Sequence, residues 1–291
     1  MKIAIFGCSG TAGFHISAAL AKNQDVVRVA RNSQGADFRM NAADSESVES
    51  LLQEVRPDVV INAVKSSFSI DAAEVRKPEA WESNVLVPEV LSRLQPKHGY
   101  KLIHLSSDWV YEGKESETYS EKSIPYPQNF YAVTKLVAEE RILRYASDYL
   151  ILRTTGLFGA DERKSNFFMR ARKTIESGEF FDAAGDQYSQ AIYGGELAQI
   201  ISSAIGMKTA GTYNAVSRDY LSRYELAILF CEVYGWDARL VRRTESAKRE
   251  IRVPQHLKLD ISRLERDIWK VRPIKEQVQN MKQELANIAI S

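Results

Sequence analysis

Three glycines, Gly7, Gly10 and Gly13, lie where a short apolar run meets a helical pattern near the start of the chain. The run Ile3–Phe6 predicts a buried strand, and Gly13–Lys22 predicts a helix. Between a strand and a helix, such glycines permit a tight turn, let a pyrophosphate approach the backbone and let the helix pack closely on the sheet. The N–H groups at the helix start then face the phosphates. The spacing therefore indicates a dinucleotide-binding turn.

Strand and helix patterns alternate through the first half of the chain. Two further strands, Asp25–Ala30 and Asp58–Ala63, flank a helix over Asp44–Glu54 that Asp44 can cap. Because parallel neighbours need a crossover connection, this alternation predicts a parallel sheet with helices on both faces. The elements expected next are helices at Glu79–Leu94 and Ala132–Tyr145 and strands at Lys101–Ser106 and Tyr149–Arg153.

After about residue 155 the strands become shorter and the loops longer. We therefore expect an α/β fold, a Rossmann-like doubly wound parallel sheet with a smaller C-terminal substrate-binding subdomain. Residues 1–155 would form the NAD(P)-binding domain and 156–291 the substrate-binding cap, with part of 190–235 packing back on the first domain. Helices in the second half are expected at Asn166–Ser177, Gly195–Ile205, Ser222–Tyr234 and Ile274–Ile288.

Charge and composition exclude several classes of protein. The chain has 39 Lys+Arg against 38 Asp+Glu, a net charge of +1, which argues against nucleic-acid binding by bulk electrostatics and against a polybasic membrane-surface protein. The first apolar run is too short for a signal peptide, and no stretch is long enough to span a membrane. The 2 cysteines are too few for a disulfide framework. We expect a cytoplasmic protein without nucleic-acid or membrane partners.

The 4 histidines are scattered, without the spacing of a metal site, so no metal is expected. A basic stretch near residues 239–252 is interpreted mainly as a solvated face. Arg252 is the residue in it preferred for contact with an anionic substrate group. The stretch comprises Arg239, Arg242, Arg243, Lys248, Arg249 and Arg252.

The end of the second strand bears on the choice of dinucleotide. An acidic residue there would accept hydrogen bonds from the ribose of NAD, whereas a basic one accommodates a 2′-phosphate. This chain has Arg31 and no acid at that point. NADP(H) is therefore the favoured cofactor, with NAD(H) left open.

Tyr131 and Lys135 form a Y-x-x-x-K pattern on a predicted helix, so both side chains lie on one face. A nearby cation is expected to lower the tyrosine pKa, tuning the phenol to donate a proton to a carbonyl that receives hydride. Ser107 follows a predicted strand, and ligands of doubly wound sheets bind outside the carboxyl ends of strands. Its hydroxyl can therefore share the site and stabilise developing negative charge.

Further segments along the chain match the pattern of a known family together with these motifs. With them, the sequence resembles extended short-chain dehydrogenases/reductases, and within them the dTDP-4-dehydrorhamnose reductase family, over nearly its whole length. The segments that carry the resemblance are the glycine turn, Arg56–Ala63, Ser106–Gly113, Pro127–Lys135, Arg153–Gly159, Gly185–Tyr188 and Leu259–Asp260.

The resemblance implies a Ser–Tyr–Lys triad at Ser107, Tyr131 and Lys135, with Lys135 also holding the nicotinamide ribose. It implies that the substrate, a sugar nucleotide, lies against Ser107, Asp108 and Tyr131. The cofactor contacts that it implies are Gly10, Thr11, Ala12, Asn41, Ala42, Ala63, Val64 and Lys65.

The sequence departs from the family pattern at three points. Gly156 stands where the family usually has a tryptophan that packs against the sugar, and Asn41 stands where it has an aspartate. Lys65 interrupts a segment that is usually alanine-rich. Because Gly156 and Lys65 line the expected sugar site, the hexose or the stereochemistry of reduction can differ from that of the rhamnose pathway.

The resulting hypothesis is NADPH-dependent reduction of a nucleotide-activated 4-keto-6-deoxy sugar, with Tyr131 as proton donor. Two alternatives stay open: an epimerase or dehydratase that retains its cofactor, and a non-catalytic NADP-binding regulatory subunit. The sequence names neither the sugar nor the nucleotide, and it leaves a homodimer open.

Overall fold

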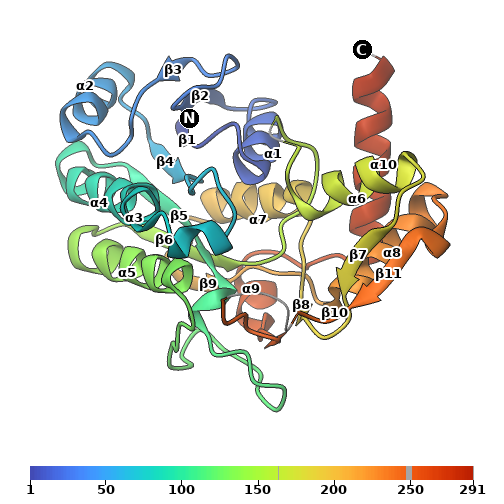
Figure 1. Cartoon of the computed structure of the whole chain (residues 1–291). Helices are drawn as coiled ribbons and strands as arrows, with labels where there is room; N and C mark the ends of the chain where they lie inside the picture. The colour runs from blue at the N-terminus through green and yellow to red at the C-terminus, as the bar shows by residue number, and fades with distance from the viewer. Residues whose placement is uncertain (163, 247–250, 291) are drawn as a thin grey trace.

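The computed structural model describes residues 1–162, 164–246 and 251–290. Its centre is a 7-stranded parallel sheet with strand order β3-β2-β1-β4-β5-β6-β9 (Figure 1). This order confirms the predicted doubly wound α/β fold. The strands of the sheet are β1 (Lys2–Phe6), β2 (Asp25–Ala30), β3 (Phe38–Arg39), β4 (Val59–Asn62), β5 (Lys101–Ser107), β6 (Tyr149–Thr154) and β9 (Gly211–Asn214).

Alternate residues of the central strand β1 pack into two separate hydrophobic clusters, one on each face of the sheet. Ile3 and Ile5 belong to a cluster that includes apolar residues of α1 (Thr11–Leu20) and α7 (Gly194–Gly206). Ala4 and Phe6 belong to a second cluster on the other face of the sheet, because successive strand side chains point to opposite faces. The helices of that second face are α2 (Ser45–Val55), α4 (Val87–His98) and α5 (Phe130–Tyr145) (Figure 1).

The chain is helical throughout the expected span Glu79–Leu94, which confirms that expectation, but the helix is not regular. A short helix α3 (Lys77–Trp81) leads into a π-helical turn η2 (Glu82–Leu86), and α4 follows. In η2 the N–H of Val87 donates to the carbonyl of Glu82, five residues back. Pro88 has no N–H to give to the residue four positions earlier, so the regular ladder is interrupted at this point.

The second half builds a smaller body beside the sheet (Figure 1). Its apolar core includes Phe158, Phe168, Phe181 and Phe230. Two small sheets edge this body: one consists of β10 (Leu221–Ser222), β8 (Tyr188–Ser189) and β12 (His256–Leu257), and the other of β11 (Val241–Thr244) and β7 (Phe181–Ala184). The helices of this body are α6 (Phe167–Glu176), α8 (Arg223–Tyr234) and α10 (Ile274–Ile290). The short helix α9 (Ser262–Asp267) packs instead on β9 of the main sheet. Short 3₁₀ turns are η1 (Asp71–Glu74), η3 (Asp108–Val110) and η4 (Ala238–Leu240).

Although α7 and β9 follow residue 155 in the chain, they complete one helical layer and one edge of the main sheet. In the structure, α7 packs against α1, and β9 pairs with β6. The division of the chain into residues 1–155 and 156–291 as domains remains a prediction.

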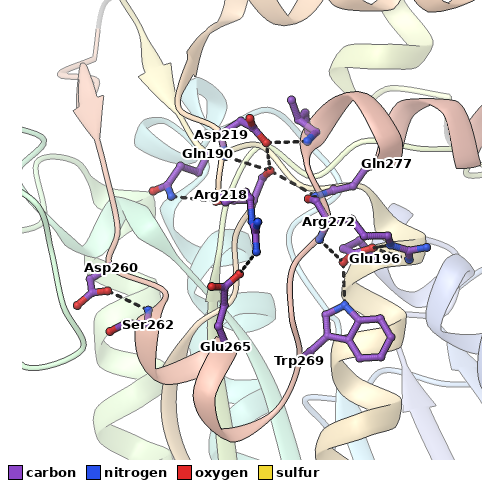
Figure 2. Close-up of polar contacts among 12 residues, drawn as sticks. Gln190, Glu196, Arg218, Asp219, Asp260, Ser262, Glu265, Trp269, Arg272 and Gln277 are labelled. Carbon is purple, nitrogen blue, oxygen red and sulfur yellow. Dashed lines mark hydrogen bonds and ion pairs between the residues drawn. The ribbon is translucent and has the colours of Figure 1, made fainter.

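A buried carboxylate fastens the C-terminal segment to α7 (Figure 2). Glu196 has no exposed surface and accepts hydrogen bonds from Trp269 Nε1 at 2.8 Å and from Arg272 Nε at 2.6 Å. Nearby, Asp219 accepts from the N–H of Ile274, the first residue of α10, at 2.7 Å. These contacts fix where α10 begins relative to the main sheet.

Within the described part of the chain, no helix combines the length and the apolar character needed to cross a bilayer. Across the same residues, no group of three or more His, Cys, Asp or Glu side chains is arranged to hold a metal ion. Cys8 and Cys231 are both buried free thiols.

Candidate active site

The glycine turn joins β1 to α1, and two of its glycines are required by the backbone. Gly7 has φ +85°, and a Cβ on it would lie 2.7 Å from the backbone carbon of Ala63. A Cβ on Gly13 would lie 2.2 Å from the carbonyl oxygen of Gly7. At Gly10 a Cβ would meet only that same oxygen, at 3.7 Å, so the space beside the helix start is open.

This open space adjoins the N-terminus of a 10-residue helix that has no acidic residue in its first turn. Gly10 occupies the N-cap position, and among the residues that the structure describes no side chain caps the first N–H groups of α1. Unsatisfied amides at a helix start attract phosphate groups. The residues present therefore fit the pyrophosphate of a dinucleotide, with Thr11 and Ala12 at the start of the helix.

A loop that follows β6 lies over this turn. The hydroxyl of Thr11 donates to Asp161, whose side chain also accepts from Asn166 Nδ2 at 3.0 Å. Asn166 Nδ2 also donates to the carbonyl of Gly159 at 2.7 Å. Sequence reasoning missed this covering loop, because its partners are about 150 residues away from Thr11 in the chain.

The structure brings Ser107, Tyr131 and Lys135 to the carboxyl edge of the sheet. Ser107 is the last residue of β5, and its Oγ accepts from the N–H of Trp109 at 3.2 Å. The Ser107 hydroxyl donates to Asp108 Oδ1 at 3.2 Å and is near enough to the Tyr131 phenol to lower its pKa. Lys135 is buried one helical turn after Tyr131, and its Nζ donates to the carbonyl of Leu105 at 3.0 Å.

The pKa of Tyr131 differs from the expectation. Burial raises it to about 12, the Ser107 hydroxyl lowers it, and the charge of Asp108 raises it. The expected lowering by Lys135 was wrong in direction, because desolvation of the phenolate dominates and the Lys135 ammonium is engaged by Leu105. At neutral pH the phenol is therefore protonated, the form that can donate a proton.

The pKa of Lys135 is lowered to about 8, mainly by burial and next by the nearby charge of Lys65. The charge of Glu139 opposes this shift. Glu139 lies one further turn along α5, where it is buried and accepts from Arg153 Nη2 at 2.6 Å. Sequence reasoning missed Glu139, although the continued four-residue spacing from Tyr131 through Lys135 was a signal for it.

Asp108 is fully buried beside Ser107, and burial raises its pKa to about 7. The Thr155 hydroxyl and the charge of Arg223 act in the opposite direction. Within the described residues, Asp108 Oδ2 has no hydrogen-bond partner. An unpaired oxygen buried at this position is a natural acceptor for a hydroxyl of a bound substrate.

Gly156 adopts φ +47°, which favours glycine, and a Cβ on it would lie 2.9 Å from the Cβ of Ala191. The same Cβ would lie 3.7 Å from Arg223 Nη1. Arg223 therefore borders Gly156. Neither Thr155 nor Arg223 was singled out from the sequence; Arg223 directly follows the Ser222 cap of α8, far from the other motifs.

The segment after β4, expected to contact the cofactor, is tied to the catalytic helix. The N–H of Val64 donates to Asn62 Oδ1 at 3.1 Å, and that of Ser66 donates to Asn84 Oδ1 at 3.2 Å. Asn84 Nδ2 in turn donates to Thr134 Oγ1 at 3.0 Å. Ala63, Val64 and Lys65 thus share one hydrogen-bonded frame with α5.

Arg31 directly follows β2, and its side chain contacts Asn41 and Glu82. Ala42 is partly buried against the core of that face. Arg252 is exposed, and its carbonyl accepts from Asn129 Nδ2, while Asn129 caps α5. Lys248 and Arg249 of the basic stretch lie outside the described residues.

In oxidoreductases of the short-chain dehydrogenase/reductase class, the glycine turn and the tyrosine–lysine pair lie along the carboxyl edge of one parallel sheet, and this chain is a member of that class. Within the class it belongs to the RmlD substrate binding domain family, whose model matches residues 1–287.

Relatives agree with this assignment over most of their length. The chain is 28% identical over 236 residues to a dTDP-4-dehydrorhamnose reductase of Burkholderia thailandensis, covering 78% of this chain and 76% of the relative. A crystal structure of a dTDP-4-dehydrorhamnose reductase from Clostridium acetobutylicum superposes with a TM-score of 0.88 at 25% identity, covering 98% of this chain and 100% of the other.

A dTDP-4-dehydrorhamnose reductase of Bacillus anthracis, solved in complex with NADP, shares the fold. Its TM-score is 0.88 at 21% identity, with 97% of this chain and 99% of the other covered. The chain is accordingly an oxidoreductase of the RmlD family.

Proposed function

We propose that the protein reduces the C4 keto group of a nucleotide-activated 4-keto-6-deoxy sugar, with NADPH as the preferred reductant. The observation that carries the proposal is the group formed by Ser107, Tyr131 and Lys135. The open helix start at Gly10, which fits a dinucleotide, supports it. The name of the Burkholderia relative, a dTDP-4-dehydrorhamnose reductase, supports the substrate class.

A bound nicotinamide cofactor supplies the hydride. Tyr131, which is protonated at neutral pH, donates its proton to the carbonyl oxygen as that oxygen gains electron density. Ser107 donates a hydrogen bond to the same oxygen and orients it. Lys135, one turn after Tyr131 on the same helix, helps to hold the nicotinamide ribose.

The substrate side of the proposal rests on Asp108, Gly156 and Arg252. Asp108 offers its unpaired Oδ2 to a sugar hydroxyl, and Gly156, which Ala191 and Arg223 border, is proposed to lie against the sugar. Arg252, exposed near the cap of α5, is the proposed contact for the diphosphate. Because Gly156 and Lys65 depart from the family pattern, we expect the sugar or the product stereochemistry to differ from that of the rhamnose pathway.

NADP(H) is proposed because Arg31 follows β2, and the Bacillus anthracis relative was solved with NADP. NAD(H) remains the second choice. Cytoplasmic localisation and the lack of nucleic-acid and membrane partners remain predictions from composition, and a homodimer remains open.

The test is NADPH oxidation measured by absorbance against a panel of dTDP-, UDP- and GDP-4-keto sugars, with wild type and Tyr131→Phe. The variant keeps the ring that packs edge-on against Trp109 at 5.9 Å and loses only the hydroxyl. We expect turnover to fall by at least about 100-fold with NADPH binding nearly unchanged. Normal turnover in the variant would refute the mechanism.

The same assay separates the proposed reductase from both alternatives. An epimerase or dehydratase would convert a sugar nucleotide without net consumption of NADPH. A regulatory subunit would bind NADPH, but none of the sugars in the panel would cause NADPH oxidation.

A further inference from the structure

Two side chains that could bind a cofactor 2′-phosphate are each held by a carboxylate. The first is Arg31, whose Nη2 lies 2.6 Å from Asn41 Oδ1 and 2.9 Å from Glu82 Oε1. Asn41 Nδ2 also donates to Glu82 Oε1, at 2.7 Å. The three side chains form a closed network at the carboxyl end of β2, where the adenosine ribose of a dinucleotide binds.

The second is Ser33, three residues beyond β2. Its Oγ donates to Glu162 Oε2 at 2.8 Å and accepts from the N–H of Gly35 at 3.1 Å. Burial and the charge of Glu162 raise the pKa of the Cys8 thiol in the glycine turn. Glu162, which belongs to the loop after β6, is therefore close to both the glycine turn and the end of β2.

We propose that Glu82 and Glu162 are specificity-determining residues that weaken selection for a 2′-phosphorylated cofactor. A phosphate monoester carries nearly two negative charges at neutral pH, so these carboxylates repel it and compete with it for Arg31 and Ser33. The 2′-hydroxyl of NAD(H) is neutral and can donate a hydrogen bond to a carboxylate. The acid that NAD-binding sites place at the end of the second strand is thus supplied here from two other segments.

Neither carboxylate is needed to hold the fold together. The side chains of Arg31 and Glu82 are 55% and 30% exposed, and ion pairs of this kind contribute little to stability. Glu82 is the first residue of the π-helical turn η2, a feature that occurs frequently at functional sites. Glu162 is exposed. Substitution of either residue is therefore expected to leave a folded protein.

The experiment titrates the purified full-length chain with NADPH and with NADH, following nicotinamide fluorescence without a sugar substrate. The variants are Glu82→Gln and Glu162→Gln. The control is Glu79→Gln, an exposed residue one turn before Glu82 that pairs with Arg76 at 3.0 Å. We expect each of the first two variants to bind NADPH roughly fivefold more tightly, with NADH binding unchanged or weaker, and the control to match wild type.

Arg31 provides a further check on the mechanism. In an Arg31→Gln background, Glu82→Gln should keep only the part of its effect on NADPH affinity that comes from direct charge repulsion, because the arginine that it releases is gone. Glu162→Gln should keep its effect, since it acts through Ser33. If Glu82→Gln and Glu162→Gln leave the NADPH-to-NADH affinity ratio unchanged, or shift both affinities equally, the inference is overturned.

The inference rests on the proposed function only in requiring that this cleft bind a dinucleotide. Failure of the wild-type chain to bind either cofactor would overturn both. A shifted affinity ratio without turnover of any sugar would support the inference while counting against the proposed reduction.

Discussion

Removing the carboxylate of Glu196 should destabilise the fold strongly, although it is remote from the catalytic group. The side chain has no exposed surface and accepts three hydrogen bonds, from Trp269 Nε1, from Arg272 Nε and, at 3.1 Å, from the backbone N–H of Arg272 (Figure 2). In Glu196→Ala all three donors lose their acceptor. Breaking a buried ion pair by removing one partner costs about 3–5 kcal/mol. Because Arg272 is 33% exposed and water can reach it, we expect the lower end, about 3 kcal/mol.

The expected shift in melting temperature follows from the length of the chain. An unfolding entropy of about 2.1 cal/mol/K per residue gives roughly 0.6 kcal/mol/K for the whole protein, so about 3 kcal/mol lowers Tm by about 5 °C. Urea and thermal unfolding followed by circular dichroism measure both quantities. The matched control is Glu232→Ala, which removes an ion pair of 2.6 Å to Lys275 whose partners are 58% and 55% exposed.

The control should lose less than about 1 kcal/mol, because water screens an exposed pair. Equal losses in the two variants would refute the reasoning that burial rather than ion-pair distance decides the cost. So would a loss below about 1 kcal/mol in Glu196→Ala.

Two further predictions concern the site. Because burial raises the pKa of Asp108 to about 7 from 3.8, the folded state holds a proton that the unfolded chain releases between these values, and stability should fall as pH rises through this window. The midpoint of urea unfolding, measured from pH 4 to pH 8, should fall less with pH in Asp108→Asn than in the wild type. An equal fall in both proteins would contradict the raised pKa of Asp108. Gly13→Ala should lower stability by at least about 2 kcal/mol, because its Cβ would lie 2.2 Å from a backbone oxygen, whereas Gly10→Ala should fold normally and lose dinucleotide affinity. Thermal melts with cofactor titrations check both glycine variants, and equal melts for the two would count against the geometry.

The strands and helices that the sequence predicted well are those with long or fully buried patterns. The run at Asp58–Ala63 became β4, and the alternation of strands and helices predicted the parallel sheet that the structure and its relatives confirm. Strands of two residues, such as β3 and β12, were missed, because two residues carry no periodic pattern. The helix over Glu79–Leu94 formed as predicted, but its periodicity gave no sign of the π-helical turn beside Pro88.

The sequence predicted that Ser107, Tyr131 and Lys135 share the candidate site but not the direction of the pKa shift of Tyr131. Spacing placed Tyr131 and Lys135 on one helical face, and a strand end supplied Ser107. The sign of the Tyr131 pKa shift depended on burial, which the four-residue spacing does not contain.

The sequence by itself determined the fold class and the family, because glycine spacing and strand–helix alternation are local properties of the chain. Only the tertiary structure decided which charges face one another. It brought Glu82 to Arg31 and Glu162 to Ser33 from about 50 and 130 residues away. Electrostatic energy depends on distance in space and on the surrounding dielectric, and neither quantity follows from position along the chain.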